Sequence, residues 1–200
     1  MDEIVKAAML KWPKVPHCYG WLALDERGVW RMRDERTQAL NLAGDAIRNA
    51  GLRDFINRNY QVDEKGCWYF QNGPQKVYVD LLATPYIAHV GERGLWQLHT
   101  GEMLAPPSAA YIIGEGKLVL RSKNVLAQVD DRDLGYALDA LCCQGKALSE
   151  QDLEKVLQAR PGQNIGIRMT VQGTTVSVEK TTLEHLILQE KYCLKPRDNA

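Results

Sequence analysis

The sequence predicts an α+β protein of two small lobes, each built from antiparallel β-hairpins or meanders with packed helices. Three observations predict this class. A charged turn followed by Gly-x-Trp recurs along the chain. Segments in which apolar and polar residues alternate surround the copies of this turn. Stretches with helical periodicity separate the alternating segments.

The first predicted elements are a short helix and a hairpin. Apolar residues in segment 2–12 fall at three- and four-residue spacings, with acidic residues at its start and Pro13 beyond its end. This pattern predicts an amphipathic helix. Segment 21–32 then has the pattern of two strands joined by a turn, which Gly28 closes because glycine adopts positive φ readily.

The turn of the first hairpin recurs three times. Segment 63–68 matches segment 25–30 in charge class, glycine and tryptophan, segment 92–96 repeats the last five positions, and segment 115–118 is a degraded copy. Charged residues suit an exposed tip, and an aromatic residue two positions after the glycine faces one side of the outgoing strand. We interpret the copies as hairpin tips with core tryptophans. A functional row of aromatic side chains is the alternative.

Helical and strand patterns alternate through the middle of the chain. Segment 44–60 has the periodicity of a helix capped by Asp45. Segment 68–86 predicts an antiparallel meander. The prolines and small residues of segment 104–108 predict a linker, so we place the boundary between a lobe of residues 1–105 and a lobe of residues 106–200.

The second half repeats the order of the first half. A hairpin is predicted over 111–120, and a helix is predicted to end at Cys142 and Cys143. A capping box of Ser149 and Asp152 predicts a helix over 150–159, which further strands follow over 166–179. Amide-Gly turns followed by Val-x-Val-acid occur in segments 71–80 and 172–179. This similarity favours an internal duplication, with generic strand chemistry as the alternative.

The bulk composition is that of a globular protein and excludes several classes. Hydrophobic residues make up 45% and charged residues 25%, and 25 basic residues balance 25 acidic ones, so nucleic-acid binding has no global electrostatic source. The N-terminus lacks the pattern of a secretory signal, and no apolar run approaches the roughly 18 to 20 residues of a membrane helix. Five cysteines without a disulfide-framework spacing favour free thiols and a cytoplasmic location.

Several runs of residues resemble a family of uncharacterised proteobacterial proteins of unknown function. They are DFINRNY at 54–60, GCWYFQNGPQKVYV at 66–79, WPKVP at 12–16 and CYGWL at 18–22. More distantly, the order of hairpin, helix and hairpin resembles another bacterial family of unknown function, whose fold repeats a structural motif in two lobes. The resemblance implies a bacterial origin and a two-lobed architecture. It implies no catalytic residue.

A polar cluster in the first lobe is the candidate ligand site. Amides, an arginine, a lysine and a tyrosine in this cluster suit an anion, a peptide or a small polar ligand. Its members are Asn57, Arg58, Asn59, Tyr60, Gln71, Asn72, Gln75 and Lys76. The alternative is structural, because Asn and Gln cap helices and close turns, and Arg58 is placed to pair with Asp54 four residues earlier.

Other candidate sites have simpler explanations. His17 and Cys18 are adjacent and point apart in a strand, and the cysteines lack the spacing of a metal site. The acids of segment 130–133 suit a helix N-terminus. Glycines do not form a phosphate-binding pattern. We therefore assign no catalytic residue, no metal ligand and no cofactor.

The sequence thus favours a non-enzymatic binding or regulatory module for a small polar ligand or a protein. Exposed strand edges in such meanders allow a second copy to pair as a homodimer. One alternative is an enzyme that joins Arg58, Asp80 and a histidine in a cleft between the lobes. The other, which the balanced charge disfavours, is nucleic-acid binding through Arg31, Arg33, Arg36, Arg48, Arg53 and Arg58.

Overall fold

The computed structural model describes residues 1–12, 14–114 and 116–198, and it divides into two compact units. Unit 1 comprises Met1–Pro85 together with Lys191–Ala200, and unit 2 comprises Tyr86–Glu190. The chain therefore leaves unit 1 after Pro85 and returns to it after Glu190. The predicted α+β class with two lobes is confirmed.

The division lies elsewhere than the boundary expected near residue 105. Segment 104–108 belongs to unit 2 and connects two of its strands. Leu104 is buried, the Ser122 hydroxyl donates to the Pro106 carbonyl over 3.1 Å, and the Ser108 amide donates to the Arg121 carbonyl over 2.7 Å. These contacts pack the proline pair against the sheet, so it does not act as a linker.

Unit 1 contains a six-stranded sheet in the order β3-β2-β1-β6-β5-β4 among the described residues. Its strands are β1 (Cys18–Leu24), β2 (Trp30–Met32), β3 (Asp45–Ala46), β4 (Tyr60–Val62), β5 (Trp68–Asn72) and β6 (Gln75–Leu81). Its helices are α1 (Glu3–Lys11), α2 (Glu35–Ala39) and α3 (Ala50–Arg58). Strands β1 and β6 pair in parallel, and the other neighbours pair antiparallel. The sheet is therefore mixed, whereas the sequence predicted antiparallel pairing.

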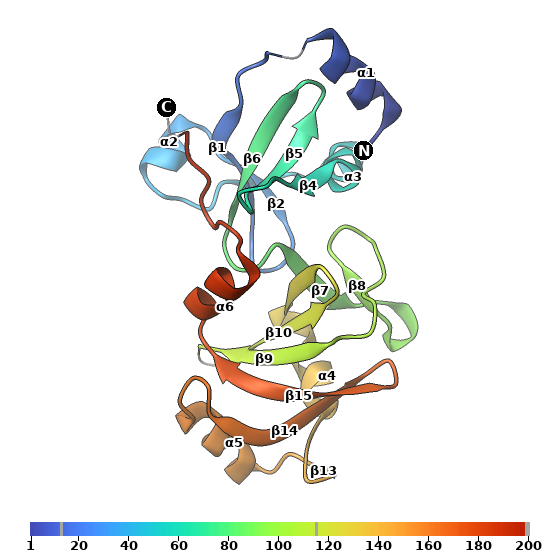
Figure 1. Cartoon of the computed structure of the whole chain (residues 1–200), viewed down its shortest axis with the longest axis vertical. Helices are drawn as coiled ribbons and strands as arrows, with labels where there is room; N and C mark the ends of the chain where they lie inside the picture. The colour runs from blue at the N-terminus through green and yellow to red at the C-terminus, as the bar shows by residue number, and fades with distance from the viewer. Residues whose placement is uncertain (13, 115, 199–200) are drawn as a thin grey trace. The chain divides into compact units, whose positions relative to one another are not determined.

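Unit 2 contains a nine-stranded sheet in the order β13-β12-β14-β15-β9-β10-β11-β7-β8 among the described residues. Its strands are β7 (Tyr86–Val90), β8 (Trp96–Leu98), β9 (Ala109–Ile113), β10 (Lys117–Ser122), β11 (Val125–Val129), β12 (Leu141–Cys143), β13 (Lys146–Ala147), β14 (Asn164–Val171) and β15 (Thr174–Thr181). Its helices are η1 (Glu92–Gly94), η2 (Asp131–Asp133), α4 (Leu134–Asp139), α5 (Glu150–Gln158) and α6 (Leu183–Glu190). Figure 1 shows β14, β15 and β9 running side by side in this sheet, which agrees with their pairing.

The two sheets share a five-strand arrangement. Its order is β2-β1-β6-β5-β4 in unit 1 and β8-β7-β11-β10-β9 in unit 2. In each case a hairpin precedes a meander whose last strand pairs in parallel with the first strand of the hairpin. Leu22 lies opposite Val79, and Ala88 lies opposite Val129. This register makes segment 71–80 of unit 1 equivalent to segment 121–130 of unit 2. The Val-x-Val-acid pattern in the sequence suggested segment 172–179 as the equivalent.

The recurring charged turns form hairpin tips, as predicted. Asp25 Oδ1 accepts the amides of Arg27 and Val29 at 3.0 and 2.8 Å. Asp63 Oδ1 accepts the amides of Lys65 and Cys67, both at 2.9 Å. The third copy has a glycine in place of the aspartate and forms η1. The fourth copy includes residue 115, which lies outside the described residues.

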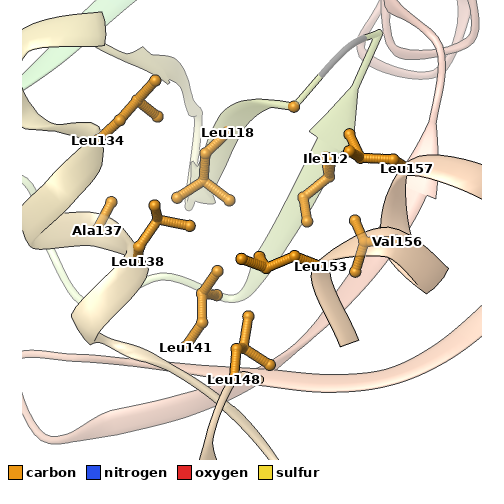
Figure 2. Close-up of a pocket in the computed structure, with 11 residues that line it drawn as sticks. Ile112, Leu118, Leu134, Ala137, Leu138, Leu141, Leu148, Leu153, Val156 and Leu157 are labelled. Carbon is orange, nitrogen blue, oxygen red and sulfur yellow. The ribbon is translucent and has the colours of Figure 1, made fainter. Parts of the chain in front are cut away.

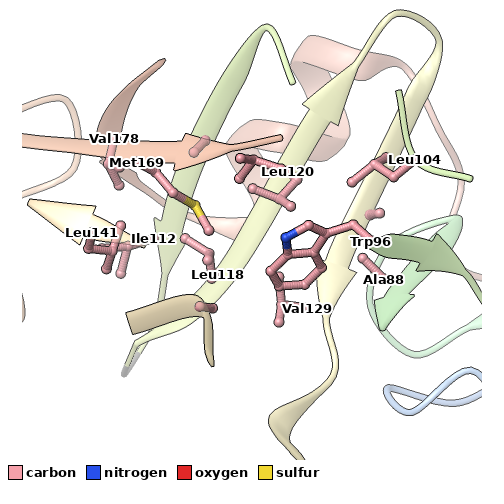
Figure 3. Packing of buried hydrophobic residues seen from close by; sticks show 14 of the residues in the cluster. Ala88, Trp96, Leu104, Ile112, Leu118, Leu120, Val129, Leu141, Met169 and Val178 are labelled. Carbon is pink, nitrogen blue, oxygen red and sulfur yellow. The ribbon is translucent and has the colours of Figure 1, made fainter. Parts of the chain in front are cut away.

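The tryptophans that follow the first three turns are core residues, which confirms their interpretation. Trp30, Trp68 and Trp96 are 2%, 8% and 2% exposed. Figure 3 shows the Trp96 ring among the aliphatic side chains of the unit 2 core, which include Leu120 and Val129. Each indole removes a large apolar area from water and so anchors its hairpin to the core.

The helix predictions are confirmed in part. Helices α1 and α5 lie where they were expected, and the capping box of Ser149 and Asp152 is present. The predicted cap Asp45 was wrong: it lies in β3, and α3 begins after Asn49, whose side chain accepts the Leu52 amide at 2.9 Å. Helix α4 ends at Asp139, and residues 141–143 form β12 because they pair with β14.

No helix of the described residues is long and apolar enough to cross a membrane.

Candidate functional site

A groove of about 880 Å³ on unit 1 is the candidate site. Tyr19 of β1, Tyr69 of β5 and Tyr78 of β6 line it, together with residues of the β4–β5 turn and of the C-terminal segment 193–198. We call it the tyrosine groove. In Figure 1 the C-terminal segment, in red, runs beside the strands of unit 1.

The sheet brings the three tyrosines together because β1, β6 and β5 are neighbours in this order. The rings of Tyr19 and Tyr78 stack with centroids 4.6 Å apart and planes 5° apart. Tyr69 and Tyr78 are register partners, and their centroids are 5.8 Å apart. Alternation along a strand sends Phe70 to the opposite face, where Phe55 of α3 packs against it.

The tyrosine hydroxyls in the groove stay protonated at neutral pH. Burial and the hydrogen bond to Asp63 raise the pKa of Tyr78, whose hydroxyl donates to Asp63 Oδ2 over 3.0 Å. Burial also raises the pKa of Tyr19 and of Tyr69. The ammonium of Lys76 lies 4.5 Å from the centre of the Tyr69 ring, within the range of a cation–π contact.

Two cysteines from distant parts of the sequence meet in the groove. Cys67 lies at the end of the β4–β5 turn, and Cys193 lies in the C-terminal segment. Burial, followed by the influence of Cys193 and Asp63, raises the pKa of Cys67 to about 11. The Cys67 side chain is therefore almost entirely in the thiol form at neutral pH, which is a poor nucleophile.

A buried carboxylate fixes the C-terminal segment beside the groove. Asp80 of β6 is 1% exposed and pairs with Arg33 Nη1 at 2.7 Å and with Arg197 Nη1 at 2.8 Å. A second cavity of about 230 Å³, which Tyr19, Arg33, Asp80 and Arg197 help to line, adjoins this network. The paired carboxylate raises the pKa of Arg197.

Most residues of the predicted polar cluster form contacts within the fold. Asn57 Oδ1 accepts the Trp30 indole N–H at 2.8 Å, and Asn59 Oδ1 accepts the Asp2 amide at 2.9 Å. Arg58 pairs with Asp2, which precedes α1, at 3.3 Å, in place of the pairing with Asp54 that the structural alternative expected.

The β5–β6 hairpin brings Gln71 opposite Lys76 and Asn72 opposite Gln75, but the side chains of the remaining members contact different partners. The Tyr60 hydroxyl donates to the Pro85 carbonyl at 3.0 Å, and Gln71 donates to the Gly73 carbonyl at 2.8 Å. Gln75 donates to the Pro16 carbonyl at 2.9 Å. Asn72 lines an apolar cavity beside α3. Of the eight predicted residues, Lys76 is the one that lines the tyrosine groove.

Several residues considered for an enzyme site and for nucleic-acid binding form ion pairs within the fold. Arg58 pairs with Asp2, whereas Asp80 pairs with Arg33 and Arg197. Arg31 also pairs with an acid, Asp25, at 2.8 Å. Carboxylates therefore neutralise three of the six arginines that were considered for nucleic-acid binding.

Unit 2 holds a second polar cluster around Asp130. Its carboxylate accepts the Arg132 amide at 2.9 Å, which confirms that an acid of segment 130–133 caps a helix. Burial opposes its ionisation, but hydrogen bonds from Arg132 prevail and lower its pKa to about 2. His89 Nδ1 lies 3.1 Å from the same carboxylate. Among the described residues, no group of three or more His, Cys, Asp or Glu side chains is arranged to hold a metal.

Sequence reasoning missed the C-terminal segment of the groove. Segment 193–198 supplies two cations, Lys195 and Arg197, and the thiol of Cys193. More than one hundred residues separate it from β5 and β6, so no local pattern connects them. The alternation that places Tyr69 and Tyr78 on one face was the available signal.

Solved structures resemble this fold at low identity. A DUF1285 family protein from Silicibacter pomeroyi aligns with TM-score 0.50 and 12% identity, over 93% of this chain and 98% of that chain. A DUF1285 family protein from Shewanella baltica aligns with TM-score 0.38 and 10% identity, over 58% of this chain and 88% of that chain. The first likeness supports the fold alone. No curated protein matches the chain.

The family comparison covers nearly the whole chain. The family model DUF2944, described as a protein of unknown function (DUF2946), matches residues 1–197. This match confirms the resemblance to a family of unknown function that the sequence motifs indicated. The chain belongs to the DUF2944 family.

Proposed function

We propose that unit 1 is a non-enzymatic binding module whose tyrosine groove holds a small polar ligand with an anionic group. The observation that carries this proposal is the combination of stacked, protonated tyrosines with the cations Lys65, Lys76 and Lys195 around one open groove. Its volume of about 880 Å³ lies within the range of small-molecule sites.

The chemistry of the groove supports an anionic ligand. Tyrosine rings offer apolar faces, and lysine ammonium groups attract negative charge. The Tyr78 and Tyr69 hydroxyls already donate to Asp63 and Gln61. Three acids, Asp63, Glu64 and Asp198, also line the groove. The Asp63 carboxylate already accepts the Tyr78 hydroxyl and two backbone amides of its turn. The hydrogen-bonding capacity of Asp63 is therefore largely used within its own turn and by Tyr78.

The raised pKa of the Cys67 thiol favours a binding function over nucleophilic catalysis. A catalytic cysteine needs a lowered pKa, and that of Cys67 is raised to about 11. His17 contacts the edge of Tyr78, with ring centroids 5.9 Å apart and planes at 70°, so it packs as an aromatic side chain.

A comparison of the two units supports a specific role for the tyrosines. Tyr69 and Tyr78 face each other in β5 and β6, and the corresponding partners in β10 and β11 are Val119 and Gln128. The shared five-strand arrangement therefore forms without tyrosines at these positions. In unit 1 both tyrosines are 7% exposed, so they contribute to the packing of the sheet as well as to the lining of the groove.

Calorimetric titration tests the proposal with a panel of carboxylates, sugar phosphates and nucleotides. We expect one class to bind, and Lys76→Ala to weaken that binding about tenfold, as the loss of one charged contact of about 1.4 kcal/mol implies. Lys123→Ala, in the β10–β11 turn of unit 2, is the control and should leave the affinity unchanged. The proposal fails if no class binds, or if both variants bind as the unaltered chain does.

A further inference from the structure

Cys67 and Cys193 are placed as disulfide partners without a bond between them. Both are free and half-buried, and they face each other in a parallel β-bridge. The Cys193 amide donates to the Gly66 carbonyl at 3.0 Å. Neighbouring strands lie about 4.7 to 4.9 Å apart, and this spacing lies within the Cα–Cα range that a disulfide requires.

The backbone around this pair is held in place on both sides. A Cβ atom on Gly66 would lie 1.9 Å from the Lys191 carbonyl oxygen, so the C-terminal segment approaches the β4–β5 turn as closely as a glycine allows. Beyond the cysteine, the Leu81 amide donates to the Leu194 carbonyl at 2.7 Å. The two thiols therefore stay in register without any rearrangement of the chain.

We propose that Cys67 and Cys193 form a reversible disulfide that locks the C-terminal segment as a wall of the tyrosine groove. Disulfide formation itself does not depend on the proposed ligand. Its consequence for binding does rest on the proposed function, because Lys195, Pro196 and Arg197 lie two to four residues after Cys193 and line the groove. A locked wall is already ordered before the ligand arrives, so binding costs less entropy.

Glutathione disulfide is the oxidant that the proposal names. A thiolate of the pair attacks one glutathione sulfur, the S–S bond breaks, and one glutathione leaves as a thiolate. The second protein thiolate then displaces the other glutathione from the mixed disulfide. The protein loses two protons and two electrons, and one glutathione disulfide becomes two glutathione molecules.

The remaining cysteine of unit 1 provides a matched control. Cys18 is also half-buried and free, but it lines the apolar cavity beside α3 together with Phe55 and Phe70. Alternation along β1 places it on the face opposite Tyr19. Cys18→Ser should therefore leave the oxidation unchanged, whereas Cys67→Ser and Cys193→Ser should abolish it.

The test uses the full reduced chain, incubated with glutathione disulfide at mildly alkaline pH. We expect intact mass to fall by two hydrogens, and a non-reducing peptide map to join the peptides that contain Cys67 and Cys193. Dithiothreitol should reverse both changes. A stable glutathione adduct, a linkage that involves Cys18, or no linkage in the folded chain would overturn the proposal.

Hydrogen exchange tests the locking separately from ligand binding. In the oxidised chain, amides of segment 191–198 should exchange at least several-fold more slowly than in the reduced chain. Equal exchange rates would overturn the lock even if the disulfide forms. Failure of the ligand panel with intact disulfide formation would count against the proposed function alone.

Discussion

Among single residues, His99 makes the stability of unit 2 depend on pH. Burial, followed by the proximity of His89, lowers the pKa of His99 from its ordinary value of 6.5 to about 3. Its Nδ1 accepts the Ile87 amide at 3.2 Å. The side chain thus stays neutral in the folded protein over a pH range where the unfolded chain binds a proton. Stability therefore falls as pH decreases from 6.5 toward 3.

We predict that His99→Asn flattens the pH dependence of stability between pH 6.5 and 4.5. Asparagine keeps an acceptor for the Ile87 amide but does not titrate. One proton bound only by the unfolded chain corresponds to a slope of about 1.4 kcal/mol per pH unit in the free energy of unfolding. Urea unfolding at several pH values measures this slope. The exposed His185→Asn should retain it, and an equal slope in the His99 variant would contradict the prediction.

Gly66 shows how one residue determines the approach of two segments. Its φ is 76°, and a Cβ atom would collide with the Lys191 carbonyl. We predict that Gly66→Ala destabilises the protein more than Gly173→Ala, which has φ of 78° and nothing within 4 Å of the added Cβ. Gly173→Ala, the control, should lower the free energy of unfolding by about 1 to 2 kcal/mol, because alanine disfavours the left-handed backbone conformation by this amount. Equal losses in urea unfolding would show that the close approach contributes nothing.

Residues whose environment is local were predictable from the sequence, and residues with distant partners were not. The turn chemistry around Gly28 and Gly66 indicated that Trp30 and Trp68 enter the core. By contrast, Asn57 was assigned to a ligand site, and its amide oxygen instead accepts the indole N–H of Trp30, 27 residues away. The same polar atom suits a ligand or a buried partner, and the sequence alone does not distinguish them.

Among the elements, β6 is fixed to its surroundings by a buried ion network. The Arg33 side chain is 8% exposed, whereas that of Arg197 is 53% exposed, and both pair with Asp80. We predict that Asp80→Ala costs about 3 to 5 kcal/mol, because it leaves the buried guanidinium of Arg33 without its carboxylate.

Arg197→Ala should cost about 1 kcal/mol or less, because solvent screens its exposed pair. Chemical denaturation of the two variants measures both losses. Similar losses in the free energy of unfolding for Asp80→Ala and Arg197→Ala would contradict the prediction that the buried Arg33–Asp80 pair contributes most. A double variant should lose little more than Asp80→Ala, because both substitutions remove the same ion pair.

Element boundaries were predictable where a local signal specifies them. The capping box of Ser149 and Asp152 specifies the start of α5 without any tertiary contact. The end of α4 was not predictable, because residues 141–143 continue a helical pattern but pair with β14 more than twenty residues later. Strand pairing across the sheet overrides local helix propensity at this point.

For the whole molecule, the topology depends on contacts that no local pattern encodes. The chain returns to unit 1 after α6, where the Tyr192 hydroxyl donates to the Ala83 carbonyl at 3.3 Å. Tyr192 itself is 6% exposed. The sequence indicated two lobes through its repeated turns, but it suggested two consecutive lobes. A pairing between segments more than one hundred residues apart changes this division.

Because residues after Glu190 belong to unit 1, truncation of the chain after Glu190 should destabilise unit 1 selectively. Unit 1 would lose the Arg197 pair of Asp80, the Leu194 carbonyl that accepts the Leu81 amide, and the buried ring of Tyr192. Unit 2 would keep its core, which is formed by residues between Ala88 and Val178. We therefore expect hydrogen exchange to accelerate in β1 and β6 and to stay unchanged in β9, β10 and β14. A chain that ends at Asp198 is the control, since it keeps all three contacts. Equal acceleration in both sheets would show that the segment stabilises the whole molecule and not unit 1 in particular.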